Sequence, residues 1–456
     1  MREVEIARAL AETVEREGGR AYFVGGYVRD LCLGQATKDV DVEVFGIVPA
    51  RLRAILAGLG EVVEKGASFG VLSLAHTNLD VAMPRTESRT GGRHTDFDVC
   101  VEPFLSTREA SRRRDFTINA MMMDICTGEI LDYWGGRRDL QARVIRHVED
   151  ATFADDALRV FRAAQFCARL EAVVAPETLE VCAKMDVSAI TRERVFDELA
   201  KALLKARRPS MFFEVLESTG HLEEFFPEIA ATRGVEQSPK YHPEGDVYRH
   251  TMLVLDQAAL LRGRAREPLF FMLAALCHDL GKIDATQVLE DGRIVSHMHP
   301  VTGQRLAEMQ LRRLSDNARM IRYVTDMVAN HMRPNAMAFS RSRKKKTRML
   351  FDQSVCPEDL ILLSRADASG KRDQPYDEQL EQFLQQRLLD YRQAASRPMV
   401  TGRDLIEAGV EPGAEFAPLI RRARELCFAD VPREAALRQV LAERESVRLR
   451  REKQAE

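Results

Sequence analysis

The chain has 456 residues, of which 45% are apolar and 30% charged, and its formal net charge is −3 at pH 7. This composition is typical of a globular protein of two to four domains. The charge excludes a chain that is basic throughout, so binding to nucleic acid would have to rest on local basic clusters. Two such clusters, Arg112-Arg113-Arg114 and the basic residues of 341–348, stand out, although a single basic run is more often a solvated surface.

The eight cysteines contain no C-x-x-C pair, which excludes a zinc ribbon and a disulfide framework and predicts a reducing compartment. Residues 1–20 have no apolar signal core, and the apolar run at 269–277 is too short to span a bilayer. We therefore expect a cytoplasmic protein with no membrane partner.

Residues 1–145 mix strand and helix patterns, with two alternating segments around His76-Thr77-Asn78 forming a hairpin pattern. The predicted elements, in chain order, are a strand at Ala21–Val24, a turn at Gly25-Gly26, a helix at Val28–Leu33, a strand at Val40–Phe45, hairpin strands at Val71–Ala75 and Leu79–Met83, and a strand at Phe116–Asp124.

Asp39 and Asp41 form a D-x-D pattern at the second strand, which places both carboxylates on one face. Two divalent ions are the usual way to hold such a pair in phosphoryl transfer, and magnesium suits oxygen ligands. Gly26 lets backbone N–H groups approach phosphate oxygens, and Arg29 is a candidate triphosphate clamp. Asp80, on the second hairpin strand, is a candidate third metal-side carboxylate.

From Asp155 onward nearly every segment has helical periodicity. The clearest examples are Asp155–Leu170, Glu193–Leu204, Pro209–Thr219 and Pro268–Leu280. Prolines at 227, 239 and 243 mark a joint between two helical blocks. The predicted fold class is therefore α+β, with a mixed-sheet head followed by an all-α neck and body.

Several motifs occur in a fixed order: G-G-x-V-R-D at 25–30, D-V-D at 39–41, Arg85-Thr86-Glu87 with the basic loop through Gly91-Gly92-Arg93, R-R-D-F-T-I-N-A at 113–120, D-D-A-L-R-V-F-R at 155–162, and E-R to Glu198 at 193–198. This set resembles the polymerase-β-like superfamily, in the class II tRNA nucleotidyltransferases and bacterial poly(A) polymerases. The resemblance implies template-independent nucleotide addition to an RNA 3′ end, with magnesium at Asp39 and Asp41.

Asp156 and Arg159 lie three residues apart on the predicted helix and face the same way. Cytosine and adenine present an amine donor beside an acceptor nitrogen, which an aspartate and an arginine can satisfy, whereas uracil and guanine present the reverse. The resemblance implies a base-selecting role for Asp155, Asp156 and Arg159. Asp155 departs from the family, which commonly has Glu there.

Two more arginines belong to these motifs. Arg114 is a candidate contact for the nucleotide sugar or phosphates, with Asp115 holding it. Arg162 is expected either to reach phosphate or to hold Asp156.

His250, His278-Asp279 and Asp367 form a second ordered set, with His331 between the last two. Two imidazoles and two carboxylates can enclose a divalent metal and leave a position for water. His297 and His299 are candidate ligands for a second ion, and an imidazole-rich site suits Ni²⁺, Co²⁺ or Mn²⁺. The set resembles the HD superfamily of metal phosphohydrolases, which implies hydrolysis of phosphomonoesters or 2′,3′-cyclic phosphates. A fold that has kept its packing and lost hydrolysis is the alternative.

Four regions follow from these expectations: a nucleotidyltransferase head at 1–145, a base-selecting neck at 146–225, an HD domain at 226–375 and a helical, tRNA-contacting tail at 376–456. The resemblance implies addition of C, C and A to tRNA from CTP and ATP, with the tRNA 3′ end as partner and no obligate protein partner. A poly(A) polymerase and an enzyme that adds only CC or only A remain alternatives. An HD hydrolase with an inactive head is a further one, against which intact Asp39 and Asp41 argue.

Overall fold

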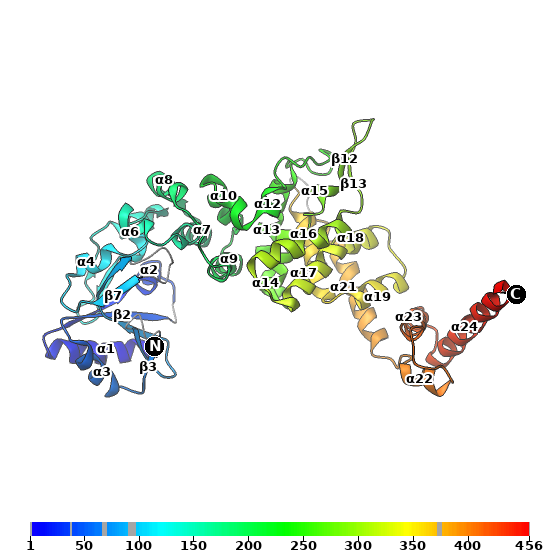
Figure 1. Cartoon of the computed structure of the whole chain (residues 1–456), viewed down its shortest axis with the longest axis horizontal. Coiled ribbons are helices and arrows are strands. Elements are labelled where there is room, and N and C mark those ends of the chain that lie inside the picture. The colour runs from blue at the N-terminus through cyan, green and yellow to red at the C-terminus, as the bar shows by residue number, and fades with distance from the viewer. Residues whose placement is uncertain (1, 37–38, 66–70, 90–96, 372–375, 456) are drawn as a thin grey trace. The chain divides into compact units, whose positions relative to one another are not determined.

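The computed structural model describes residues 2–36, 39–65, 71–89, 97–371 and 376–455. The chain divides into two compact units, Met1–Phe225 and Phe226–Glu456 (Figure 1). The first contains the large sheet and the second is almost wholly helical. These features confirm the α+β head and the helical remainder.

The first unit begins with the head and continues into a group of helices. Its elements are α1 (Arg2–Arg16), β1 (Arg20–Val24), α2 (Gly26–Cys32), β2 (Val40–Phe45), α3 (Pro49–Ala57), β3 (Val62–Lys65), β4 (Val71–Leu74), β5 (Leu79–Ala82), β6 (Arg85–Arg89), β7 (Phe97–Val101), α4 (Thr107–Arg112), the 3-10 turn η1 (Thr117–Asn119), β8 (Met122–Asp124), β9 (Ile130–Leu131), α5 (Gly136–Ala142), β10 (Val144–Ile145), α6 (Asp150–Ala154), α7 (Leu158–Leu170), β11 (Val173–Val174), α8 (Pro176–Lys184), α9 (Arg192–Lys205), α10 (Ser210–Ser218) and α11 (Leu222–Phe225).

The head sheet has seven strands in the order β3-β4-β5-β2-β1-β8-β9, so β2 lies at its centre. β2 alternates buried valines with acidic residues, which buries one face of the strand against α1 and leaves the acidic face for the site. β2 runs antiparallel to β1 and parallel to β5. The predicted hairpin is present, because β4 and β5 pair antiparallel.

Two sequence expectations in the first unit were wrong. The predicted strand at Phe116–Asp124 is a strand only from Met122, because Thr117–Asn119 forms a 3-10 turn. The predicted helix at Asp155–Leu170 begins at Leu158, because the chain breaks between α6 and α7. There the Asp156 side chain accepts a hydrogen bond from the Leu158 N–H at 3.1 Å, which competes with helical pairing.

The second unit is built on a set of packed helices. Its elements are α12 (Pro227–Ala230), α13 (Val247–Leu261), the 3-10 turn η2 (Arg262–Arg264), α14 (Pro268–Cys277), α15 (Lys282–Ala285), β12 (Thr286–Val288), β13 (Ile294–Ser296), α16 (His299–Leu314), α17 (Ala318–Asn330), α18 (Met332–Phe339), α19 (Lys344–Gln353), α20 (Pro357–Ser369), α21 (Glu378–Ala395), α22 (Gly402–Glu407), α23 (Phe416–Cys427) and α24 (Arg433–Ala455).

The centre of the second unit is α14, whose residues from Phe271 to Cys277 are all buried. This helix packs against α13, α17 and α20. An apolar helix that is buried all round places the residues at its C-terminal end inside the core. His278 and Asp279, which follow α14, are accordingly buried.

All eight cysteines are free thiols. Within the parts of the chain that the structure describes, no helix combines the length and the apolar character that crossing a membrane requires.

Candidate active sites

The glycine turn of the head lies against the acidic face of β2. Gly25 has φ 63° and ψ −130°, a conformation that L side chains rarely adopt. A Cβ on Gly25 would lie 3.3 Å from Arg114 Nη1 and 3.9 Å from Asp41 Oδ2. The turn, the carboxylate of Asp41 and the guanidinium of Arg114 therefore surround one point, although they come from three separate segments. Gly26, at the start of α2, is half-buried beside this point.

The structure brings a second carboxylate to Asp41. In the parallel pairing of β2 and β5, Asp41 is the register partner of Asp80, so both side chains lie on the same face. Asp80 accepts a hydrogen bond from the Ser73 hydroxyl, which orients its carboxylate. Asp39 is exposed and directly precedes β2. Carboxylate oxygens are the ligands that Mg²⁺ prefers, so the paired side chains of Asp41 and Asp80 fit a divalent ion, with Asp39 two residues before Asp41.

Arg29 does not lie open to a ligand as the sequence suggested. Its side chain is buried, with Nε and Nη2 donating to Asp30 Oδ1 at 2.8 and 2.6 Å and Nη1 donating to Asn119 Oδ1 at 2.7 Å. Burial lowers the pKa of Arg29, and the Asp30 carboxylate opposes this effect. The residue ties the start of α2 to η1, beneath the glycine turn.

Asp115 links the head to α7. Its Oδ1 accepts from the Phe116 N–H and the Asn119 amide, and its Oδ2 accepts from Arg162 Nε at 2.7 Å. Arg162 also lies 3.9 Å from Glu198 Oε1 on α9. Arg162 is thus paired with Asp115 rather than with Asp156, and the hydrogen bond of Arg114 goes to Glu43 rather than to Asp115.

The three candidate base-selecting residues lie around the break before α7. Asp155 is exposed, while Asp156 is half-buried and accepts from Arg194 Nη2 at 3.2 and 3.0 Å. Arg159 donates from Nη1 to the Thr152 carbonyl at 2.6 Å and from Nη2 to the Arg113 carbonyl at 2.8 Å. Asp156 precedes the helix, so the two side chains do not form the expected pair on one helix face.

The basic segments differ in how much of each is described. In the predicted loop after Arg85-Thr86-Glu87, Gly91-Gly92-Arg93 lie outside the described residues, although the flanking β6 and β7 form an antiparallel pair. In the 341–348 cluster, Arg348 is buried and donates to Asp390, which also pairs with Lys344. Part of that cluster is therefore structural.

The second site lies inside the second unit, where side chains from α13, α16 and α20 meet the ends of α14 and α17. His250 Nε2 lies 3.1 Å from Asp367 Oδ1 and 3.7 Å from Asp279 Oδ2, and His278 Nε2 lies 3.3 Å from Asp279 Oδ2. The four residues expected to bind one ion are all buried and converge around the Asp279 carboxylate.

Two further imidazoles complete the cluster. His299 Nε2 lies 3.3 Å and His331 Nε2 3.6 Å from Asp279 Oδ1, and both rings are buried. Asp279 thus stands between two sets of ligand atoms, one on each carboxylate oxygen. His297, the other candidate for a second ion, is exposed and belongs to none of the ligand groups among the described residues.

The hydrogen bonds of the imidazoles suit metal binding. The Nδ1 atoms of His278, His299 and His331 lie 2.7–2.8 Å from backbone carbonyls, so they carry the proton and leave Nε2 as the free lone pair. His278 Nε2 and Asp279 Oδ1 are buried and have no hydrogen-bond partner among the described residues. Buried polar atoms without partners that converge on one point fit divalent metal ligation.

The carboxylates of this site stay ionised. Burial raises the pKa of Asp279, but Lys282 and His278 outweigh it and hold the pKa well below its usual range. Asp367 is shifted in the same direction, since His250 outweighs burial and lowers the pKa. Anionic oxygen ligands are therefore available at neutral pH.

Sequence reasoning missed two residues that support the histidines. Glu244 Oε1 lies 2.8 Å from His250 Nδ1 and 2.9 Å from His242 Nδ1, which fixes the orientation of the His250 ring. Lys282 is buried, with its Nζ 2.7 Å from Asp279 Oδ2. The H-D-L-G-K sequence could have indicated the pairing of Lys282 with Asp279, because the two residues are three positions apart.

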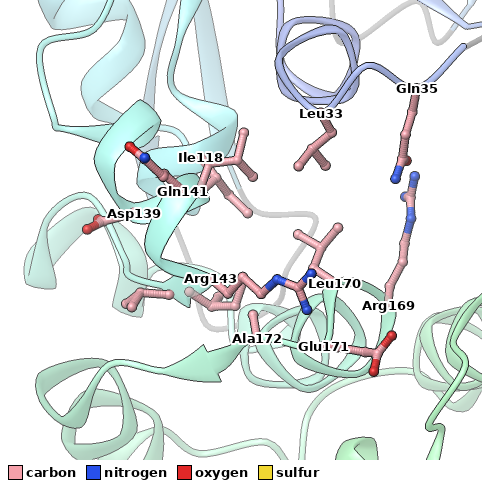
Figure 2. Close-up of a pocket in the computed structure, with 13 residues that line it drawn as sticks. Leu33, Gln35, Ile118, Asp139, Gln141, Arg143, Arg169, Leu170, Glu171 and Ala172 are labelled. Atoms are coloured by element: carbon pink, nitrogen blue, oxygen red, sulfur yellow. The ribbon is translucent and has the colours of Figure 1, made fainter.

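A pocket also occurs in the first unit, at the C-terminal end of α2. Figure 2 shows Leu33 and Gln35 facing Arg143, Arg169 and Leu170 across it. The glycine turn lies at the opposite end of α2, and the residues predicted for the nucleotide site do not line this pocket. The pocket is therefore separate from the Asp41–Asp80 pair.

Models of known families match the chain in the order expected from its motifs, with a head domain first and an HD domain later. The model of the poly A polymerase head domain matches residues 21–146, and that of the probable RNA- and SrmB-binding site of polymerase A matches residues 174–232. The HD domain model matches residues 247–369, which contain His250, His278, Asp279 and Asp367.

Solved structures share the fold. The chain is similar to the Bacillus stearothermophilus CCA-adding enzyme in complex with CTP, with a TM-score of 0.69, 22% identity and coverage of 98% of this chain and 99% of that one. It is also similar to the Thermotoga maritima CCA-adding enzyme complexed with tRNA, with a TM-score of 0.62, 19% identity and coverage of 96% and 95%.

Curated relatives are more similar in sequence. The multifunctional CCA protein of Pasteurella multocida is 41% identical over 271 residues, 58% of this chain and 63% of the relative. The multifunctional CCA protein of Alkalilimnicola ehrlichii is 35% identical over 430 residues, which cover 91% of this chain and 98% of the relative. With a nucleotidyltransferase head and an HD domain in the same order, the chain belongs to the multifunctional CCA protein family, the CCA-adding nucleotidyltransferases that carry a metal-dependent HD phosphohydrolase domain.

Proposed function

We propose that this chain adds C, C and A to the 3′ end of tRNA from CTP and ATP without a template. The observation that carries the proposal is that Asp41 and Arg114 both approach the glycine turn, with Asp80 paired beside Asp41 on the neighbouring strand. In nucleotidyl transfer, the attacking hydroxyl and the triphosphate must meet at a group of anionic metal ligands with cations beside them. Anionic carboxylates and a cationic guanidinium are both present at this point of the head.

Each residue of the head has a distinct part in this proposal. Asp39, Asp41 and Asp80 hold magnesium, which when bound lowers the pKa of the attacking hydroxyl and neutralises the triphosphate. The backbone N–H groups at Gly26 approach phosphate oxygens, because Gly25 and Gly26 have no side chains in the way. Arg114 binds the triphosphate or the sugar from the opposite side of the turn.

For base choice, we propose that Asp156 accepts a hydrogen bond from the exocyclic amine of cytosine or adenine. Arg194 and the Leu158 N–H fix this carboxylate, so the acceptor is positioned before the nucleotide arrives. Arg159 supplies the donor, since a guanidinium has five N–H groups and its hydrogen bonds to the Thr152 and Arg113 carbonyls use two. Asp155 lies exposed at the same break and adds negative charge there.

Single-nucleotide incorporation into tRNA that lacks CCA tests this proposal. The wild-type enzyme should incorporate C and A and reject U and G. Asp156→Asn replaces an acceptor oxygen with an amide donor, so discrimination against U and G should fall by about tenfold or more. Asp186→Asn, at a surface carboxylate that accepts from Ser188, is the matched control and should leave selectivity unchanged. Equal loss of rate for all four nucleotides would show that Asp156 does not read bases.

We further propose that the HD site hydrolyses phosphomonoesters or 2′,3′-cyclic phosphates, which suits repair of an RNA 3′ end. His250, His278, Asp279 and Asp367 hold one transition-metal ion such as Ni²⁺, Co²⁺ or Mn²⁺, and His299 and His331 offer ligands to a second. The metal when bound lowers the pKa of water and so supplies a nucleophile at neutral pH. Hydrolysis of 2′,3′-cyclic AMP with each ion titrated separately tests this, and no hydrolysis with any ion would leave the cluster structural.

We place both activities in the cytoplasm, where tRNA acts. The tail at 376–456 is the proposed tRNA contact, and no obligate protein partner is needed for either reaction.

A further inference from the structure

Glu43 is a buried acidic residue at the nucleotide site to which no role has been given. It lies on β2, two residues after Asp41, so it projects from the same strand face. Its side chain is only 1% exposed, in the middle of the largest sheet. Removing a carboxylate from water is costly unless cations compensate it, so its partners must account for its presence.

Those partners are the two arginines of the R-R-D motif. Glu43 Oε2 accepts a hydrogen bond from Arg114 Nη2 at 2.9 Å, and Glu43 Oε1 lies 3.5 Å from Arg113 Nη2. The Arg114 side chain is about one quarter exposed, so it is still accessible to a ligand while its Nη2 is bound to Glu43.

The geometry connects this ion pair to the glycine turn. While Arg114 Nη2 is held by Glu43, Arg114 Nη1 lies 3.3 Å from the point where a Cβ on Gly25 would stand. Because a guanidinium is planar, the hydrogen bond from Nη2 restricts the directions in which its other N–H groups point. The carboxylate of Glu43 therefore aims Arg114 at the turn.

The backbone of the same dipeptide is held separately. Arg159 Nη2 donates to the Arg113 carbonyl at 2.8 Å, so α7 fixes the main chain while Glu43 fixes the side chains. Loss of Glu43 should accordingly free the guanidinium of Arg114 without displacing the R-R-D segment.

We propose that Glu43 is a positioning residue for nucleotide binding, which orients Arg114 toward the triphosphate at the glycine turn. This inference rests on the proposed nucleotidyltransferase function. Glu43 itself does not touch the reacting atoms. Its effect should therefore appear in the KM for CTP and ATP more than in kcat.

The test is Glu43→Gln in the full chain, which keeps the size of the side chain and removes its charge. The KM for CTP and for ATP should each rise about tenfold, with kcat changed less than about threefold. Asp124→Asn is the matched control, because Asp124 is also a buried carboxylate of this sheet that binds an arginine, Arg20, but lies on β8 away from the turn. The control should keep the wild-type KM.

A double-mutant cycle makes the mechanism testable. If Glu43 acts through Arg114, Glu43→Gln should add less than about twofold to the KM of Arg114→Gln. Arg114→Lys keeps the positive charge but removes the planar set of N–H donors of the guanidinium. This variant should raise the KM on its own, and it provides a second readout if Glu43→Gln folds poorly.

Three results would overturn the proposal: an unchanged KM in Glu43→Gln, an equal rise in Asp124→Asn, or full additivity in the cycle. Failure of the proposed function looks different, since the wild-type enzyme would then incorporate neither C nor A.

Discussion

At the scale of single residues, the proposed head site depends on the charge of its carboxylates, which an amide of the same size lacks. Asp41→Asn removes one charge from the metal ligands at the glycine turn while keeping the size of the side chain. We expect addition of both C and A to fall by about a thousandfold or more, because one set of ligands serves every step. Quenched-flow incorporation of each nucleotide measures this, and tRNA binding should persist because cationic contacts provide it. Near-normal incorporation would remove Asp41 from the metal site.

Asp115 gives a prediction with a defined pH dependence. Burial raises the pKa of this carboxyl, but Arg162 and the Asn119 amide outweigh burial and hold the pKa below 3.8. A carboxyl whose pKa is lower in the folded state than in the unfolded state stabilises the fold at pH values above its unfolded-state pKa. That contribution is lost as the pH falls through its folded-state pKa. Asp115→Asn should lower the free energy of unfolding by about 3 kcal/mol at neutral pH, since it leaves Arg162 without its main partner.

Urea unfolding of the wild type and Asp115→Asn across pH measures this difference. It should stay constant from about pH 8 to about pH 5 and shrink only below about pH 4. A difference that fell between pH 8 and pH 6 would point to another titrating group.

At the scale of elements, Gly281 decides whether α16 can pack against the turn that contains His278 and Asp279. A Cβ there would lie 1.9 Å from the His299 carbonyl oxygen and 2.5 Å from the Gly303 nitrogen, both backbone atoms. Gly281→Ala should therefore displace the start of α16, and with it His299, and lower bound metal per chain by at least half.

The matched control for this change is Gly263→Ala, in the turn η2, where a Cβ would meet no atom within 4 Å. Metal content of the two purified variants, measured by mass spectrometry, separates them. A full metal complement in Gly281→Ala would mean that metal binding does not depend on the close packing of Gly281 against the start of α16.

The elements also show how far sequence reasoning reaches. Alternation along β2 correctly predicted a strand with acidic residues on one face, because a period of two is local information. The same alternation contained Glu43, but its pairing with Arg114 joins residues 71 apart in the chain, which no local pattern reveals. The same holds for Arg194, which binds Asp156 from 38 residues away.

Local chemistry overrode periodicity at two places. Asp156 caps the N–H of Leu158 and breaks the helix that the apolar spacing predicted, and Thr117–Asn119 turns where a strand was expected. Arg29 likewise pairs with Asp30 and Asn119 beside the glycine turn, and a charged residue that follows such a turn gives no sign in the sequence that its side chain is buried.

At the scale of the whole molecule, the two active sites belong to different units. The proposed metal ligands of the head are Asp39 just before β2, Asp41 on β2 and Asp80 on β5, and those proposed for the HD site come from α13, α16 and α20 and from the ends of α14 and α17. His278→Ala should therefore abolish hydrolysis of 2′,3′-cyclic AMP, because loss of one ligand weakens the whole site. CCA addition by the same preparation should stay within about twofold of wild type, since the HD ligands all belong to the second unit and the head belongs to the first. Parallel loss of addition in a folded variant would show that the units are coupled.

The central claim is ordered, template-independent addition of CCA, and sequencing of RNA 3′ ends tests it most directly. tRNA that lacks CCA is incubated with CTP alone, with ATP alone and with both. We predict molecules ending in CC with CTP alone, little extension with ATP alone, and a uniform CCA end with both. A long run of A from ATP would instead identify a poly(A) polymerase, and an end fixed at CC with both nucleotides would identify a partial enzyme; either result would contradict the account.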